Sequence, residues 1–315
     1  MVIVPRHEAW RRDYRANRYM RDLTTEDLLA RAGDLMTAQL FYGPNGKISI
    51  KVDAEPLSEM ERLTHVFEEL AMRGISYRHR GIIEALNLPR PPQVSEARQV
   101  LAGKSFPEKI LVKFGKRHHM AELLLNGRGR LSPASFYSDP SLGRARSDAE
   151  AQVAAYVHPA DAHRFFWVET DDRGRRAIDV SVSYVGSTQV HLQATTDFYV
   201  YCMAATCDAR MFADFDNTCV VITRPDEFVK RVQGAVSERL AGWQFFAAAV
   251  EYFDPFFSRP HQMAPHIFKH FRFSYQKEFR LLWVPPSSDV ASAHSWDHIP
   301  FEIGPLTAYA ELIRT

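Results

Sequence analysis

The sequence predicts an α+β protein in which a small, mainly helical module (residues 1–105) precedes an α+β domain (residues 106–315). Helical patterns with capping signals dominate the first part, and short alternating apolar segments typical of strands dominate the second. Pro89-Arg90-Pro91-Pro92 separates the two, because three prolines in four residues cannot continue a helix and favour an extended connector. A chain of 315 residues, 46% of them hydrophobic, has enough core material for this arrangement.

Composition restricts the classes of function. A net charge of +1 gives no global electrostatic reason to expect nucleic acid, membrane or a strongly acidic partner. Three cysteines are too few for a disulfide framework, which favours a reducing cytoplasm. The sequence has no signal-peptide core, and no run approaches the ~20 apolar residues that a membrane span needs. We therefore expect a cytoplasmic protein without membrane contact.

The first helix carries a basic arm, defined as residues 6–21, with six arginines against Glu8 and Asp13. Such an arm can contact phosphates. The alternative, which the sequence favours, is a solvated helix face that pairs with the rest of the protein.

The remaining elements of the helical module follow from local signals. Thr25 is expected to cap a helix with acidic residues in its first turn, and Ser58-x-x-Glu61 forms a capping box for a helix that ends at Gly74. Gly43-Pro44-Asn45-Gly46 predicts a turn into a strand over 47–52. Short helices are expected over 81–88 and 95–102.

In the second part, strands alternate with a few helices. Helices are predicted over 116–125, ended by Gly127, and from Pro225, with Phe228, Val232 and Val236 on one side. Strands or extended segments are predicted over 110–114, 130–137, 178–184, 190–193, 198–203, 218–222 and 243–253, although alanines leave a helix possible in the last, and a turn is predicted over 138–141.

The segment Phe271–Trp283 has the period of two that is typical of a strand. Aromatic and aliphatic residues occupy one face, whereas Gln276, Glu278 and Arg280 occupy the other. The polar face is either a water-facing sheet surface or the floor of an active-site cleft.

Metal sites and several enzyme classes are excluded by missing motifs. Cys202, Cys207 and Cys219 lack the spacing of a zinc site, and His266 and His270 have no partner ligands nearby, so no metal is expected. His118-His119 suits a phosphate contact or plain solvent exposure. The sequence has no glycine-rich phosphate loop and no nucleophile elbow. Ser147-x-x-Glu150 is explained as a capping box.

Gln276 and Glu278 remain as the pair with a plausible chemistry. A carboxylate on a strand can bond a ribose hydroxyl and stabilise an oxocarbenium-like transition state electrostatically. Gln276 is neutral and can orient an acceptor without repelling it. A Q-x-E triplet on the wet face of a strand also arises by chance.

Gln276-Lys277-Glu278 resembles the Q-x-E or E-x-E signature of the ADP-ribosyltransferase superfamily, which uses NAD. The order of elements around it is similar: the strand 110–114 with Gly115, a helix, Gly127 and Leu131-Ser132-Pro133. The segment from Lys113 to Arg280 resembles uncharacterised bacterial proteins that share a "SPASFYSDPS" turn and a "YQKEFR" strand. The resemblance implies a split, mixed or antiparallel β core, NAD as the substrate, and Glu278 and Gln276 as catalytic residues.

Two positions depart from the superfamily pattern. Lys113 stands where Arg or His is expected, and the Ser-Thr-Ser motif of the middle strand is replaced by Cys-Met-Ala-Ala-Thr, of which only Thr206 keeps a hydroxyl.

The resemblance also implies contacts with NAD. Lys113 would bind a phosphate or ribose, Tyr201 or Tyr275 would stack on nicotinamide, and Lys269 and Arg280 would hold the pyrophosphate. For Lys113 a role as an edge-strand lysine is an equal alternative, whereas for the two tyrosines a half-buried structural role is favoured. Lys269 and Arg280 can equally pair with Glu278. The implied set of NAD-binding residues is completed by Ser132, Tyr137 and Thr206, with Asp139 at the cleft border or in a plain turn.

Two functional hypotheses follow. The first is an NAD-using ADP-ribosyltransferase or NAD glycohydrolase, with a bacterial toxin or phage-defence effector as its setting, a nucleic acid or protein as its acceptor, and residues 1–105 as a site for a protein partner. The second is a non-catalytic module on the same fold that binds a nucleotide, a nucleic acid or a protein, with the basic arm as its main contact. A third possibility is that the domain regulates a neighbouring gene product by pairing with it.

Overall fold

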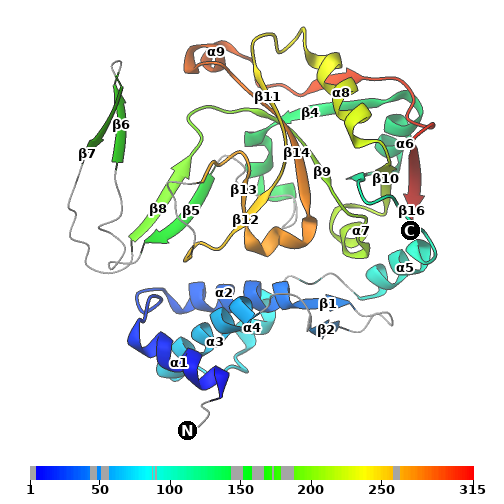
Figure 1. Cartoon of the computed structure of the whole chain (residues 1–315). Helices are drawn as coiled ribbons and strands as arrows, with labels where there is room; N and C mark the ends of the chain where they lie inside the picture. Colours follow the sequence, from blue (N-terminus) through cyan, green and yellow to red (C-terminus); the bar gives the residue numbers. More distant parts are fainter. Residues whose placement is uncertain are drawn as a thin grey trace.

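The computed structural model describes residues 5–42, 48–50, 57–86, 88, 91–142, 152–157, 167–171, 174–178, 188–257 and 263–315. The fold is α+β, and the helices α1 to α4 lie together on one side of the strands (Figure 1). None of the described helices is long and apolar enough to cross a membrane.

Before the proline cluster, the described residues form four helices and one short antiparallel strand pair, and from here on the name helical module is kept for this part. Its elements are α1 (Arg6–Ala16), α2 (Thr25–Gln39), β1 (Leu40–Tyr42), β2 (Ile48–Ile50), α3 (Leu57–Met72) and α4 (Arg80–Ala85). Tyr14, Leu28, Leu35 and Leu70 are buried in one core cluster between the helices. The cap of α2 is Thr24 rather than the expected Thr25, since the Asp27 N–H donates to Thr24 Oγ1 at 3.1 Å. The predicted turn at 43–46 lies outside the described residues, as do both ends of the strand predicted over 47–52, whose middle forms β2.

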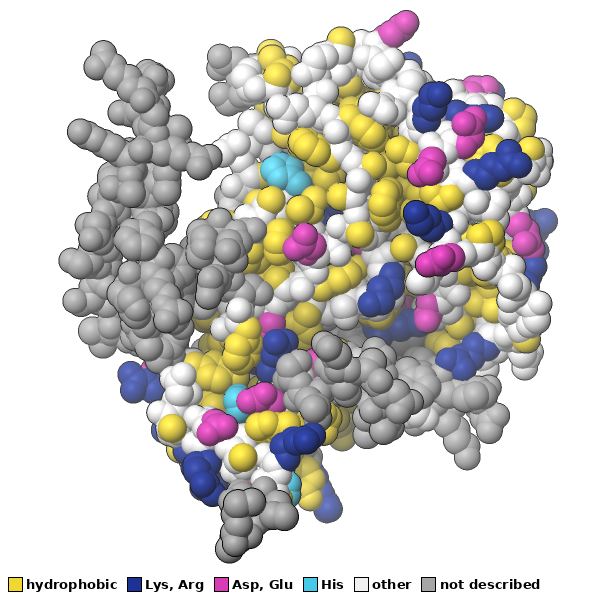
Figure 2. Space-filling model, viewed as in Figure 1, with side chains coloured by type: hydrophobic (Ala, Val, Ile, Leu, Met, Phe, Trp, Pro, Cys, Tyr) yellow, Lys and Arg dark blue, Asp and Glu magenta, His cyan; other side chains and the backbone are white. Residues whose placement is uncertain are grey.

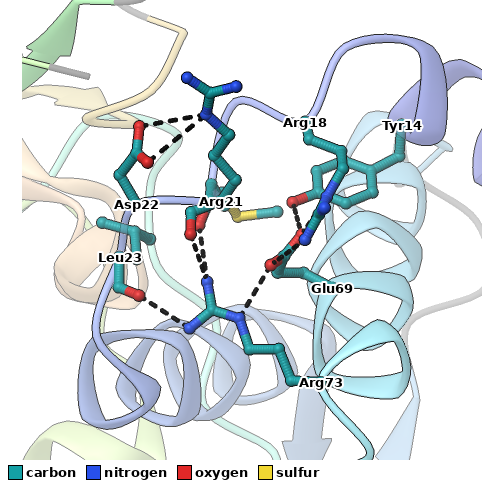
Figure 3. A network of polar contacts seen from close by, with 8 residues as sticks. Tyr14, Arg18, Arg21, Asp22, Leu23, Glu69 and Arg73 are labelled. Atoms are coloured by element: carbon teal, nitrogen blue, oxygen red, sulfur yellow. Dashed lines mark hydrogen bonds and ion pairs between the residues drawn. The ribbon is translucent and has the colours of Figure 1, made fainter. Parts of the chain in front are cut away.

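Arginines of the basic arm pair with acidic residues of α3. Arg15 Nε lies 2.6 Å from Glu68 Oε1, and Arg18 donates to Glu69 through both Nε and Nη2, at 3.1 and 2.9 Å. The fully buried Glu69 also accepts from Tyr14 and Arg73 (Figure 3). These contacts agree with a helix face that pairs with the rest of the protein.

The proline cluster does not form the predicted extended connector throughout. Helix α5 (Pro91–Leu101) already begins at Pro91. A proline is tolerated in the first turn of a helix, because its missing N–H would have no intrahelical partner there. Helix α4 ends at Ala85, three residues earlier than expected.

In the described residues the main sheet has eight strands. Six follow one another in the order β11-β14-β9-β3-β10-β16, while β4 pairs with β9 and with β15, and all these pairs are antiparallel. The strands are β3 (Leu111–Phe114), β4 (Arg128–Pro133), β9 (Tyr199–Ala204), β10 (Thr218–Ile222), β11 (Gln244–Ala249), β14 (Glu278–Val284), β15 (Ile299–Glu302) and β16 (Ala310–Arg314). The predicted strands at 110–114, 198–203 and 218–222 are confirmed.

Both faces of the sheet are covered. On one face, α6 (Arg117–Asn126) and α8 (Pro225–Val236) pack on a cluster that includes Leu281 and Trp283. On the other, α5 and α7 (Ala209–Phe215) pack on a cluster that includes Val112 and Val221. The prediction for α8 is confirmed, since its three predicted apolar residues, Phe228, Val232 and Val236, are fully buried.

Helix α6 ends at Gly127 as predicted, and the reason is both conformational and steric. Gly127 has a φ of +67°, in the left-handed region that favours glycine. A Cβ there would lie 2.1 Å from the carbonyl oxygen of Gly304, so any side chain would force the two segments apart. The Ile303 N–H donates to the Gly127 carbonyl oxygen at 3.1 Å and fixes this approach.

Smaller elements surround the main sheet. They are the antiparallel pairs β5 (Gln152–Val157) with β8 (Thr188–Gln193) and β6 (Trp167–Asp171) with β7 (Gly174–Ile178), the parallel pair β12 (Glu251–Phe253) with β13 (Phe268–His270), the 3₁₀ helices η1 (Ala134–Ser138) and η2 (Pro140–Leu142), and the helix α9 (Ser288–Ala293). The strand predicted over 190–193 lies in β8, and the one over 243–253 is divided between β11 and β12. The predicted strand over 178–184, beyond its first residue, and the capping box at 147–150 lie outside the described residues.

The single strand predicted over Phe271–Trp283 is wrong for its first half. Phe271–Gln276 forms the 3₁₀ helix η5, Lys277 adopts a left-handed φ of +44°, and β14 begins only at Glu278. Phe271 packs in the core of the helical module, whereas Leu281 packs on the sheet. The chain must therefore change direction between these two cores, and a continuous strand cannot do so.

Candidate functional site

The strands that carry the predicted site residues are neighbours in the main sheet. Strand β9 lies between β3, which carries Lys113, and β14, which carries Glu278. Ala204 is in register with Glu278 on one side and with Val112 on the other. The sheet therefore places Lys113 and Glu278 on two strands that flank the same end of β9. Val112 shares the face of Glu278, whereas Lys113 lies on the opposite face over the Tyr201 ring, so the structure does not bring Lys113 and Glu278 together.

Glu278 is buried between two cations. Lys269 Nζ donates to Glu278 Oε2 at 2.8 Å, and Arg280 Nε donates to Oε1 at 2.7 Å. The exposed fractions are only 6% for Glu278 and 0% for Arg280. Arg280 Nη1 also donates to the carbonyl oxygen of His266 at 2.8 Å, which holds the guanidinium in place. The polar face of β14 is thus a buried ion cluster with a formal charge of +1, and not a water-facing surface.

The electrostatics of this cluster keep Glu278 ionised. Burial raises the pKa of a carboxyl group, but Arg280 and Lys269 outweigh burial and hold the pKa of Glu278 well below its usual value of 4.5. The carboxylate has the charge needed to stabilise a developing cation. Its charge is, however, already compensated by its two partners.

Tyr252 fixes the backbone at Glu278, a role that the sequence analysis did not foresee. The Glu278 N–H donates to the Tyr252 hydroxyl at 2.8 Å, and the Val250 N–H donates to the Glu278 carbonyl oxygen at 2.9 Å. Burial raises the pKa of Tyr252 to about 12, so the hydroxyl stays neutral at physiological pH. A tyrosine in a three-residue strand carries no sequence signal for such a contact.

Gln276 does not share the strand of Glu278. It is the last residue of η5, and the left-handed Lys277 separates the two. Gln276 is buried, with an exposed fraction of 2%, and its Nε2 lies 3.5 Å from the Tyr275 hydroxyl. The expectation that positions 276 and 278 face one side because they alternate along a strand is therefore wrong.

Neither tyrosine proposed to stack on nicotinamide presents an open ring. The Arg210 guanidinium lies over the Tyr275 ring at 3.4 Å from its centroid. Tyr201 is buried, with the Lys113 ammonium 4.1 Å from its ring centroid and Phe301 packed edge-on at 5.4 Å. Lys113 Nζ also donates to the carbonyl oxygen of Cys202 at 2.7 Å. In this state Lys113 supports the middle strand.

The other predicted NAD contacts are scattered. Ser132 is buried in β4, where its backbone pairs with Val200 of β9. Tyr137 is half-buried in η1 beside Phe136, whereas Thr206 is exposed in the turn after β9. Asp139 Oδ1 accepts from the Ser141 N–H at 2.8 Å, which is its turn role.

Among the described residues, no group of three or more His, Cys, Asp or Glu side chains is placed to hold a metal ion. His270 Nδ1 accepts instead from the Arg272 N–H at 3.2 Å, and burial lowers the pKa of His270 to about 3. Charged side chains on the face shown in Figure 2 are interspersed by sign among the described residues.

Comparison with known proteins gives no relative: no family model, no curated protein and no solved structure matches the chain. The resemblance to the ADP-ribosyltransferase superfamily therefore rests on the motifs quoted above.

Proposed function

We propose that the chain is an NAD-using ADP-ribosyltransferase or NAD glycohydrolase, with Glu278 as the catalytic carboxylate and Gln276 as the residue that orients the acceptor. The observation that supports this proposal is the order β3-β9-β14. The strand expected to contact NAD, the expected middle strand and the strand that begins with the carboxylate lie side by side, although they are far apart in the sequence.

The reaction breaks the bond between the ribose C1′ and the nicotinamide nitrogen, and the bonding electrons leave with nicotinamide. Positive charge then develops on the ribose, and an ionised Glu278 stabilises it. Water or an acceptor group forms the new bond to C1′ and releases a proton. No oxidant or reductant is needed.

The ion cluster must rearrange for this chemistry to occur. Both carboxylate oxygens of Glu278 hold a cation, so at least one partner has to move before the ribose can replace it. Lys269 is the better candidate, because an ammonium on a flexible stem moves more easily than a guanidinium that is fixed between Glu278 and the His266 carbonyl. The NAD pyrophosphate carries the negative charge that would compensate Lys269 in its new position.

Nicotinamide release from labelled NAD tests the proposal. The wild type should release nicotinamide, and Glu278→Gln should lower kcat/KM by about 10²–10³-fold, as expected when one group that stabilises transition-state charge is lost. Glu69→Gln is the matched control, because it removes another buried, ion-paired carboxylate that belongs to the helical module. Rates are compared per folded molecule, with folding followed by circular dichroism.

Equal release by the wild type and Glu278→Gln would remove Glu278 from the mechanism. An equal loss in both glutamate variants would show that the effect comes from stability rather than from chemistry. No release from the wild type would leave the second candidate.

The second candidate is a non-catalytic module that binds a nucleotide, a nucleic acid or a protein on the same fold. It is favoured by the compensated charge of Glu278 and the burial of Gln276. In the basic arm, Arg6 and Arg12 are exposed, whereas Arg15 and Arg18 are engaged with α3. Nucleic-acid affinity that falls with salt, and whose salt dependence weakens in the Arg6→Ala/Arg12→Ala variant, would support this candidate, and an unchanged salt dependence would argue against it.

A further inference from the structure

The segment that follows β12 is held by the helical module through a buried ion pair. Asp254 accepts from Arg31 of α2 through Nη1 at 3.0 Å and Nη2 at 2.9 Å. Arg62 of α3 adds a second contact, with its Nη1 3.3 Å from Asp254 Oδ2. Because the Arg31 and Asp254 side chains are almost fully buried, water cannot replace either partner at little cost.

Aromatic side chains strengthen the same junction. Arg31 lies 4.2 Å from the ring centroid of Phe256, and the ring of Tyr156 stacks on Phe256 at 4.3 Å with an interplanar angle of 6°. Phe257 packs edge-on against Tyr19 of the helical module, with ring centroids 5.3 Å apart. The chain directly after β12 is therefore anchored in the helical module.

The strands anchored in this way also hold Glu278. Tyr252, which accepts the Glu278 N–H, lies two residues before Asp254. Lys269, which holds the Glu278 carboxylate, lies two residues before Phe271, and Phe271 packs in the core of the helical module. Each anchor is two residues from a contact with Glu278, so movement at the junction is transmitted directly to the candidate site.

The junction is not packed tightly. A pocket of about 120 Å³ lies between α2 and the anchored segments, and its lining includes Arg31, Phe256, His270 and Phe271. The Nε of Arg31 is buried without a hydrogen-bond partner in the part of the chain that is described. Regions with such incomplete packing open at lower free energy than tightly packed cores. Docking of the helical module therefore relies on the Arg31–Asp254 pair together with the aromatic contacts around it.

We propose that the helical module is a regulatory clamp on the site of Glu278. In the docked state the module holds Tyr252 and Lys269 against Glu278, which keeps the site closed. Release of Asp254 frees β12 and β13, so that Lys269 can leave the carboxylate. As a control of catalysis the clamp rests on the proposed function, but the mechanical coupling does not.

Hydrogen–deuterium exchange of the full chain tests the coupling without any substrate. In Asp254→Asn, amides of residues 251–253 and 268–276 should exchange at least about tenfold faster than in the wild type, because local opening sets their rate. Amides of β10, a fully buried strand that lies between β3 and β16, should keep their rates. Glu69→Gln is the control, since it weakens the helical module internally and leaves Asp254 paired.

Unchanged exchange over 251–253 and 268–276 in Asp254→Asn overturns the clamp, as does equal acceleration in Glu69→Gln. If Asp254→Asn accelerates exchange everywhere, including β10, the variant has lost overall stability, and Arg62→Gln is then the deciding test. The Arg62 side chain is partly exposed, so its loss destabilises the protein less. That variant must accelerate the same two segments selectively, or the clamp is wrong.

Nicotinamide release by the same variants separates the two proposals. Selective acceleration of exchange together with faster release supports both. If amide exchange is selectively accelerated but neither the wild type nor any variant releases nicotinamide, the clamp is supported and the NAD reaction is rejected. Release by the wild type with unchanged exchange in the Asp254 variant keeps the reaction and removes the clamp.

Discussion

Glu69 in the helical module and Glu278 in the sheet are both buried carboxylates held by two cations, but they differ in how completely they are bonded. Glu69 accepts four hydrogen bonds, one from Tyr14, two from Arg18 and one from Arg73. Glu278 accepts two through its side chain, from Lys269 and Arg280. Because an ionised carboxylate has about four acceptor positions, Glu69 is saturated and Glu278 is not.

The two clusters also connect different parts of the chain. Tyr14 and Arg18 lie 55 and 51 residues from Glu69, so that cluster ties α1 and the following loop to α3 (Figure 3). Lys269 and Arg280 lie nine and two residues from Glu278. A saturated cluster between distant segments is a structural fastening. The cluster of Glu278 joins near neighbours beside a left-handed residue and is held by fewer hydrogen bonds, so a ligand hydroxyl can replace one of its partners more easily.

The largest expected effect is on stability. Glu69→Gln and Glu278→Gln should each lower the free energy of unfolding by about 3–5 kcal/mol. Glu278→Gln leaves the buried Lys269 and Arg280 without their counter-charge, and Glu69→Gln disturbs the hydrogen bonds of a fully buried carboxylate whose arginine partners are partly exposed. Glu69→Gln should cost more, since four hydrogen bonds are disturbed rather than two. Urea denaturation measures both values. A larger loss for Glu278→Gln would contradict the view that Glu69 is the stronger fastening.

Acid should reproduce part of this loss. The pKa of each carboxyl group is lowered from its usual 4.5, for Glu69 by hydrogen bonds from Arg18, Tyr14 and Arg73 that outweigh burial, and for Glu278 by its two cations against burial. Their stabilisation is complete above the unfolded pKa of 4.5 and is lost as the pH falls below it through the folded pKa. The effect is smaller than that of substitution, because a protonated carboxyl group still accepts hydrogen bonds.

Urea unfolding between pH 6 and pH 3 checks this expectation. The wild type should lose stability on acidification, and each glutamine variant should lose less. A variant with the same pH dependence as the wild type would show that its glutamate does not titrate differently in the folded and unfolded states.

The smallest effects should come from the two tyrosine hydroxyls. Tyr14→Phe removes a hydrogen bond to a charged group, the 2.5 Å contact with Glu69, and should cost about 1.5–3 kcal/mol. Tyr252→Phe removes a neutral bond from the Glu278 N–H and should cost about 0.5–1.5 kcal/mol. The free energies of unfolding of the two variants and the wild type are measured by urea denaturation at the same pH and temperature. A larger cost for Tyr252→Phe would mean that the Glu278 N–H finds no other acceptor.

Elements with a single apolar face were predictable from the sequence. In α8 the residues Phe228, Val232 and Val236 recur at helical spacing, and all three are buried against the sheet. Gly127 ends α6 because the left-handed conformation there excludes other residues. In these cases the local preference and the tertiary packing agree.

The path through Phe271–Glu278 was not predictable, because distant segments decide it. Phe271, Phe273 and Tyr275 alternate as in a strand, yet Phe271 belongs to the core formed by α1 to α4. The polar face was misjudged for a related reason: Arg280 is fully buried because Glu278 and the His266 carbonyl satisfy it. Alternation alone cannot show whether a polar side chain meets water or a buried partner.

The candidate site was predictable only in outline. Lys269 and Arg280 were each expected either to hold a pyrophosphate or to pair with Glu278, and the structure shows the pairing. Tyr252 was not foreseen, since its contact depends on β12 lying beside the first residue of β14. The NAD contacts stay predictions.

The pairing of β15 with β4 and of β16 with β10 has a consequence for how the protein folds. Glu302 pairs with Arg128, and Arg314 pairs with Thr218. The sheet therefore contains contacts between residues that are about a hundred or more positions apart in the sequence. Contacts at such separations lengthen the search for the native state. During synthesis, one edge of β4 and one edge of β10 stay unpaired until β15 and β16 have left the ribosome. We expect slow folding and a need for protection from aggregation in that interval.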